Sequence, residues 1–136
     1  MFGALDTSTS ALVAQRTRAN VISANLANAN TIQDAHGANI PFRRRLAVLT
    51  PGDPTTGSSS GVHVREIAMD MRDFNKRHDP DHPLAKAAGR DYILTPNIDP
   101  MTEQVNMLET ARAYEANIAA AEATKSMMQT SLRLIA

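Results

Sequence analysis

Two histidines and two aspartates lie within five residues, and this is where the chain gathers side chains of the types that bind metals: His78, Asp79, Asp81 and His82. Their close spacing is restricted further by Pro80 and Pro83. A zinc site often takes a pair of histidines one turn apart on a helix, and Pro80 and Pro83 argue against a helix through this segment. We therefore interpret the segment as a turn ordered by proline and expect no metal ligands in the chain.

Other catalytic chemistry has little support in the residues. The chain has no cysteine, which excludes disulfides, thiolate metal sites and a cysteine nucleophile. It also lacks a G-x-S-x-G sequence, a glycine-rich phosphate loop and a facing pair of carboxylates. The sequence predicts a protein that is not an enzyme and that holds no cofactor, although a metal-dependent enzyme using residues 78–82 stays an alternative.

Three consecutive arginines, Arg43, Arg44 and Arg45, form a basic cluster. Such a cluster usually forms a solvated face of the molecule. The alternative is an ion pair between subunits, with Glu109 or Glu115 of another copy as the acceptor.

Overall charge argues against a nucleic acid or an anionic membrane as the main partner. The chain of 136 residues carries 14 basic and 14 acidic side chains, so its formal net charge is zero, whereas such partners usually select a basic excess. No apolar stretch is long enough to span a bilayer. The N-terminal residues have no basic segment before an apolar one, so we expect no cleaved signal peptide.

Two long heptad patterns indicate which elements must position these side chains. Residues 4–29 predict a helix with two alternating seam positions, occupied by Leu5, Ser8, Leu12, Gln15, Ala19, Ile22, Leu26 and Ala29. Residues 101–135 predict a longer helix that follows Pro100, with Thr102 and Glu103 as N-terminal acceptors. Its seam is Met107, Ala111, Tyr114, Ile118, Ala121, Lys125, Met128, Leu132 and Ile135.

Between the helices, residues 31–99 hold most of the prolines and glycines. Residues 51–61 have the composition of a flexible loop. The flanking runs 44–49 and 62–67 alternate in polarity, which predicts a small β-hairpin that must lie on another element.

The predicted fold is mainly α, with long N- and C-terminal helices that pair as a coiled-coil-like bundle and a small hairpin or extended insert between them. We divide the chain into an N-terminal helix at 1–30, an extended segment with the hairpin at 31–99, and a C-terminal helix at 100–136. Two paired helices bury only one stripe of each helix. The remaining alanine-rich surface must be buried by other copies or partners. The pattern therefore indicates an assembly protein.

Asn25, Asn28 and Asn30 lie at the end of the first predicted helix. Asparagine is common at helix C-termini, where a left-handed residue caps the last turn. A buried asparagine can instead fix the register of a helical interface. Both interpretations remain open at this point.

Several motifs, in order along nearly the whole chain, resemble those of bacterial flagellar basal-body rod proteins. They are Ala11–Arg18, the asparagine-rich run Val21–Thr31, Pro41-Phe42-Arg43-Arg44, Asp79–Pro83, Tyr92–Ile98, Arg112–Asn117 and Lys125-Ser126-Met127. The resemblance implies a structural subunit that polymerises through its terminal helices into the proximal rod, a drive shaft in the periplasm. It implies no catalytic role.

The resemblance also implies partners and a route. Expected partners are other copies of the chain, FlgB-, FlgF- and FlgG-like rod proteins, a FliE-like adaptor and the flagellar type III export apparatus, with no nucleic acid and no direct membrane insertion. The alternatives are another axial rod protein, FlgB- or FlgF-like, and a small helical adaptor or chaperone. The expected assembly interface comprises Leu12, Ala19, Ile22, Asn25, Leu26, Asn28, Asn30, Arg43, Arg44, Tyr114, Glu115, Asn117, Ile118, Lys125, Met128 and Leu132.

Overall fold

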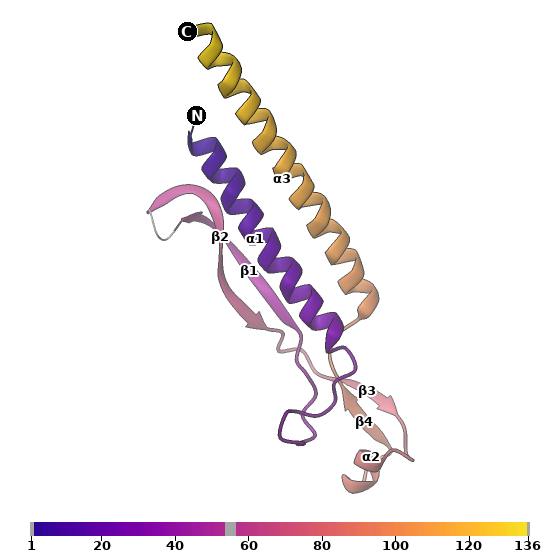
Figure 1. The fold of residues 1–136 in the computed structure, drawn as a ribbon. Helices are drawn as coiled ribbons and strands as arrows, with labels where there is room; N and C mark the ends of the chain where they lie inside the picture. The colour runs from indigo at the N-terminus through magenta and orange to yellow at the C-terminus, as the bar shows by residue number, and fades with distance from the viewer. Residues whose placement is uncertain (1, 54–56, 136) are drawn as a thin grey trace.

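The computed structural model describes residues 2–53 and 57–135. Two long helices, α1 (Phe2–Ala27) and α3 (Pro100–Ile135), lie side by side and run in opposite directions (Figure 1). A hairpin lies against the side of α1 that faces away from α3. A smaller hairpin lies beyond the end of the helix pair where α1 ends and α3 begins. The predicted fold class, long terminal helices with a small hairpin insert, is confirmed.

α3 begins at a cap that differs from the predicted one. Asp99 accepts hydrogen bonds from the Met101 N–H at 3.1 Å and from the Thr102 hydroxyl at 2.5 Å. These bonds, the one from Thr102 first, lower the pKa of the Asp99 carboxyl below its ordinary value. Pro100 then occupies the first helical position, where a missing N–H costs nothing. Thr102 is therefore a donor at this cap and not an acceptor, and the carboxylate of Glu103 takes no part in the bonds to Asp99.

The first hairpin pairs β1 (Arg45–Asp53) with β2 (Ser58–Met69) in antiparallel register, from Arg45 opposite Met69 to Asp53 opposite Ser58. The hairpin was predicted, but residues 51–53 and 58–61 continue the strands, so the prediction of a flexible loop over 51–61 is wrong there. Its central part, 54–56, lies outside the described residues. Register shifts near Pro51 and left-handed backbone at Gly52 and Gly61 let these turn-forming residues stay within the ladder.

The hairpin packs on α1 through a close backbone approach. The Ser10 hydroxyl accepts a hydrogen bond from the Val62 N–H at 3.1 Å. Gly61 has φ of +92°, and a Cβ there would lie 2.8 Å from Ser10 Oγ. Glycine at this position therefore permits both the backbone conformation and the contact.

A second hairpin was not predicted. It pairs β3 (Asn75–His78) with β4 (Tyr92–Thr95), and the short helix α2 (Pro83–Ala87) lies between them. The side chains of β3 are all exposed, so the strand lacks the alternation that marks a half-buried strand in sequence. Ile93 in β4 is buried and supplies apolar packing at this end of the molecule.

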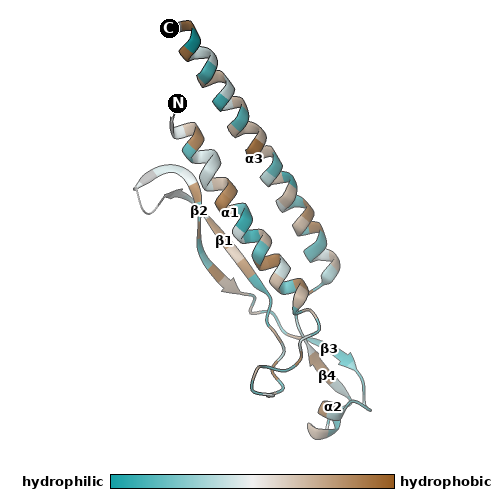
Figure 2. Ribbon diagram, viewed as in Figure 1, coloured by the Kyte–Doolittle hydropathy of each residue, from teal (hydrophilic) through white to brown (hydrophobic). Residues whose placement is uncertain are grey.

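Apolar and polar residues alternate along both long helices (Figure 2). Large apolar side chains of α3 remain exposed at many positions, among them Val105, Leu108, Met127, Leu132 and Leu134. Among the described residues, no helix is both long and apolar enough to cross a bilayer. The helix pair therefore presents a mixed surface with unusually many uncovered apolar side chains.

Candidate assembly interface

A buried set of polar side chains joins the C-terminal end of α1 to the N-terminal end of α3. We call it the central polar cluster; it consists of Asn25, Arg44, Asp70, Asn97 and Glu103. Asn25 is 1% exposed. Its Nδ2 donates to the Arg45 carbonyl at 2.8 Å and to Glu103 Oε2 at 3.0 Å, while its Oδ1 accepts from the Arg45 N–H at 2.9 Å. One amide side chain thereby ties α1 to both β1 and α3.

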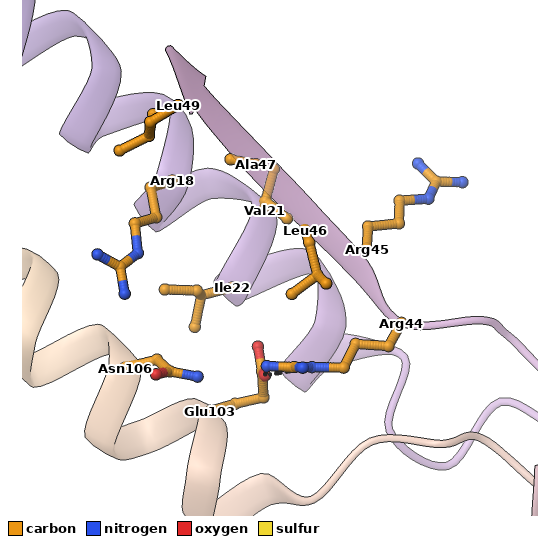
Figure 3. Close-up of a pocket in the computed structure, with 10 residues that line it drawn as sticks. All are labelled: Arg18, Val21, Ile22, Arg44, Arg45, Leu46, Ala47, Leu49, Glu103 and Asn106. Carbon is orange, nitrogen blue, oxygen red and sulfur yellow. Dashed lines mark hydrogen bonds and ion pairs between the residues drawn. The ribbon is translucent and has the colours of Figure 1, made fainter. Parts of the chain in front are cut away.

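Glu103 and Arg44 form the charged centre of the cluster. Arg44 donates to Glu103 Oε1 from Nε at 2.8 Å and from Nη2 at 2.5 Å (Figure 3). Glu103 is 1% exposed, and Arg44 is 14% exposed. A buried carboxylate is tolerated only when it is paired and hydrogen bonded, and here both oxygens have a donor.

Asp70 and Asn97 extend the cluster toward the second hairpin. Asn97 Oδ1 accepts from the Arg44 N–H at 2.9 Å, and its Nδ2 donates to the Asp70 carbonyl at 3.1 Å. The Asp70 carboxylate accepts hydrogen bonds from Arg72 and lies 3.6 Å from Arg44 Nη1. The hydrogen bonds from Arg72 outweigh the opposing effect of burial and lower the pKa of Asp70 to about 2.

The arginine cluster is used within the chain. Arg44 lies in the central polar cluster. Arg43 donates to the Asp70 and Arg72 carbonyls, and its guanidinium carbon lies 4.3 Å from the centroid of the Phe74 ring. For these two arginines the prediction of a solvated basic face is wrong, because the carboxylates and carbonyls that follow β2 and start α3 surround them. Arg45 is exposed, with its guanidinium 5.2 Å from the Phe42 ring centroid.

The three asparagines have different roles. Asn25 fixes register, as one of the two interpretations proposed, but it does so between elements of the same chain. Asn28 caps α1, since its Nδ2 donates to the Ala24 carbonyl at 2.8 Å. Neither Asn28 nor the exposed Asn30 has a positive φ, so the left-handed part of the capping prediction is wrong.

The face that α3 turns toward α1 is largely polar or small, unlike the predicted seam. Glu103 and Thr110 are its buried positions, and Asn106, Ala113, Asn117, Ala121 and Thr124 are half-buried. Five positions of the predicted seam are exposed, Ala111, Tyr114, Ile118, Lys125 and Leu132, whereas Met107, Ala121 and Met128 are half-buried. The pairing of the helices is confirmed, but the exposed positions lie beside the contact because Glu103 is held by Asn25 and Arg44.

The two predicted stripes meet along one groove between the helices. The α1–α3 groove has a volume of about 370 Å³ and is lined by Gln15, Arg16, Ala19, Met107, Thr110, Ala111, Tyr114 and Glu115. Five of these residues are seam positions from the heptad analysis, two on α1 and three on α3. The heptad residues thus form an open apolar channel on the helix pair.

Other residues of the predicted interface lie outside the lining of this groove, except Glu115. Ile22 is buried between the helices and β1, and Leu12, Leu26, Asn117 and Met128 are half-buried. Glu115 is exposed at the groove. Glu109, suggested as a partner of the arginine cluster, lies 3.8 Å from Arg18 of its own chain.

His82 has a structural role in the segment that first suggested a metal. Its Nδ1 accepts a hydrogen bond from the Leu84 N–H at 3.2 Å, so it caps α2 directly before Pro83. His78 is exposed at the end of β3. Within residues 2–53 and 57–135, no three histidine or acidic side chains are grouped as a metal site requires.

Three members of the central polar cluster, Asp70, Asn97 and Glu103, are absent from the interface predicted from sequence, where Glu103 was expected only as an N-terminal acceptor of α3. Asn97 lies in the Tyr92–Ile98 motif, and a polar residue between Pro96 and Ile98, both apolar and both buried, was a usable signal. Asp70 directly follows β2 without any periodic feature to mark it.

Comparisons with known proteins agree with this architecture. The family described as "Flagella basal body rod protein" matches residues 5–32, which include most of α1, and the family described as "Flagellar basal body rod FlgEFG protein C-terminal" matches residues 91–134, which include most of α3.

Full-length relatives carry the name flagellar basal-body rod protein FlgC. The Bacillus subtilis protein is 37% identical over 98% of this chain and 97% of its own length. The Aquifex aeolicus protein is 36% identical over 95% and 92%, and the Salmonella typhimurium protein is 35% identical over 95% and 93%. The chain belongs to the family of flagellar basal-body rod proteins and is FlgC-like.

Proposed function

We propose that the chain is a structural subunit of the proximal rod of the bacterial flagellum and polymerises through its terminal helices to transmit torque. The observation that carries this proposal is the α1–α3 groove, which is lined by heptad residues of both helices and where Ala111 and Tyr114 of α3 remain exposed. A helix pair normally buries such residues against itself, so their exposure leaves a surface that another helix can cover.

The helix pair suits a mechanical load. Each helix is internally hydrogen bonded along its length, and the central polar cluster fixes one end of the pair by bonds between buried groups. Contacts that repeat between copies without closing into a ring produce an open helical structure. Torsion applied to one subunit would then pass to the next through packed helices.

The same proposal covers location and partners. The subunit would lie in the periplasmic rod after export by the flagellar type III apparatus without a cleaved signal peptide. Its neighbours would be other copies of itself, FlgB-, FlgF- and FlgG-like rod proteins and a FliE-like adaptor. The FlgC name of full-length relatives favours the FlgC-like position over a FlgB- or FlgF-like one.

A structural subunit needs no catalytic residue, and we propose that the chain is not an enzyme. A small helical adaptor or chaperone is the alternative from a different class. It would fold as a stable monomer that occupies no fixed place in the rod, whereas the proposed subunit is required for rod assembly.

Two alanine substitutions on α3 test the proposal. Ala111→Arg places a long charged side chain in the groove, and Ala116→Arg places the same side chain five residues on, about 140° around the helix. Both alanines are exposed, so both variants should fold with unchanged circular dichroism.

We expect cells with Ala111→Arg as the sole copy to lack rods in images of isolated basal bodies and to be non-motile. Cells with Ala116→Arg should assemble rods and swim. Normal rods in the Ala111→Arg strain would contradict assembly through the groove.

A further inference from the structure

α3 is longer than α1, and within the described part of the chain no helix lies beside its C-terminal part. Asn25 bonds to Glu103 and Arg18 approaches Glu109, which sets the antiparallel alignment of the two helices. Each helical residue advances about 1.5 Å, so the beginning of α1 lies opposite residues near 126 of α3. Figure 1 shows the C-terminal end of α3 extending past the N-terminus. We call residues 127–135 the C-terminal extension.

The C-terminal extension is apolar and basic. Met127, Leu132 and Leu134 are 60%, 67% and 84% exposed. Its one charged side chain is Arg133, and no acidic residue follows Glu122. Exposed apolar side chains gathered at a helix end are typical of a surface that another molecule covers.

The α1–α3 groove offers a complementary surface. It is apolar at Ala19, Met107 and Ala111, and Glu115 stands at its α3 edge opposite Arg16 of α1. An occupant of the groove would therefore meet both an apolar floor and a charged edge.

We propose that the C-terminal extension of one copy docks in the α1–α3 groove of a second copy, with Arg133 beside Glu115. This inference rests on the proposed function and names the partner of its groove. The extension supplies exposed apolar side chains for the apolar part of the groove and the cationic Arg133 for its Glu115 edge.

The geometry makes the contact head-to-tail. The groove is centred near residue 111 of α3 and the extension near residue 131, about 30 Å away along the helix. A copy whose extension is seated still presents its own empty groove. The contact is therefore heterologous and repeats from copy to copy.

The absence of cysteine allows a direct cross-linking test. The double variant Ala111→Cys/Leu132→Cys places one thiol in the groove and one on the extension. About 30 Å of helix separates them, so no disulfide forms within one chain. The matched control is Ala116→Cys/Leu132→Cys, which keeps the extension thiol and moves the other away from the groove.

Each variant replaces the natural chain in its bacterium, and isolated basal bodies are oxidised and separated on a non-reducing gel. We expect a ladder of dimers, trimers and larger products from the groove variant and monomers from the control. Monomers alone, or dimers that do not extend, from basal bodies that contain the groove variant would overturn the docking. A natural chain that is missing from basal bodies would instead overturn the proposed function.

Charge reversal provides a second measurement that does not depend on the thiols. Glu115→Arg and Arg133→Glu should each reduce the number of complete rods per cell at least several-fold, because each places like charges together. The double reversal should restore most of the rods. A double variant as defective as the single ones would contradict the pairing of Glu115 with Arg133.

Discussion

Glu103 contacts two other members of the central polar cluster, and each of its carboxylate oxygens has a separate partner. Oε1 accepts from Arg44, and Oε2 accepts from Asn25. These bonds come from two different segments, so they set the rotation of α3 as well as its position. The rotation decides which side of α3 faces α1 and leaves the Tyr114–Ile118 side at the groove edge.

Replacing Glu103 should therefore destabilise the chain strongly. Glu103→Ala leaves the buried Arg44 without its main partner, and we expect a loss of about 3 kcal/mol in the free energy of unfolding. The matched control is Glu109→Ala, since Glu109 lies on the same helix with 64% exposure and a 3.8 Å ion pair. It should cost at most about 1 kcal/mol. Urea unfolding followed by circular dichroism measures both, and equal losses would contradict the role of the cluster.

Asp70 gives the cluster a defined response to acid. Its folded-state pKa of about 2 lies below the ordinary value of 3.8, so its ionised form stabilises the fold above pH 4. That contribution falls as the pH decreases from about 4 to about 2, because the unfolded chain binds a proton at Asp70 in this range while the folded chain does not.

Asp70→Asn should remove this part of the acid sensitivity. We expect the variant to be about 1–2 kcal/mol less stable at pH 7, because the charge-assisted bonds from Arg72 weaken, while its stability changes less than that of the natural chain between pH 4 and pH 2. Chemical unfolding at a series of pH values provides the measurement. If the free energy of unfolding changed with pH equally in the two proteins, Asp70 would not contribute to the acid sensitivity.

At the level of elements, the strongly periodic segments were the predictable ones. Both long helices follow from sustained heptads and from Pro100 at the start of α3. β3 and α2 were missed because four exposed residues and a five-residue helix carry no period. The strand character of 51–53 and 58–61 was missed because proline and glycine favour turns locally, whereas the pairing with the partner strand overrides that preference.

Gly61 lies at a close approach between the first hairpin and α1. Gly61→Ala adds a Cβ 2.8 Å from Ser10 Oγ to the strain of a left-handed backbone. Gly37→Ala carries the same kind of backbone strain at φ +78°, but its Cβ meets nothing within 4 Å. We expect Gly61→Ala to be the more destabilising by about 1 kcal/mol or more, within the range for overpacking. The measurement is thermal unfolding by circular dichroism.

Removing the clashing hydroxyl separates the two effects. The double variant Ser10→Ala/Gly61→Ala should be more stable than Gly61→Ala alone, because the atom that the new Cβ meets is gone. The gain should be partial, since the hydrogen bond from the Val62 N–H is also lost. Equal stability of the Gly61 and Gly37 variants would argue against a close approach of β2 to α1.

For the whole molecule, the heptads predicted the two helices better than they predicted the helix contact. A seven-residue period shows that a stripe will be covered, but it does not distinguish cover by the same chain from cover by another. Here polar side chains at Asn25 and Glu103 fix the contact within the chain, and much of the α3 stripe remains exposed beside it. The residues that line the groove were therefore recognisable in sequence, while the intramolecular register required the buried polar groups that heptad analysis disregards.

The most direct test of the account is a density map of the isolated basal body in which the side chains of this subunit are visible. We predict that Ala111, Tyr114 and Ile118 lie against a helix of a neighbouring subunit, with the Asn25–Glu103 bond intact inside each chain. A map in which the α1–α3 groove faces solvent or the central channel, while the subunits touch through their hairpins alone, would contradict it.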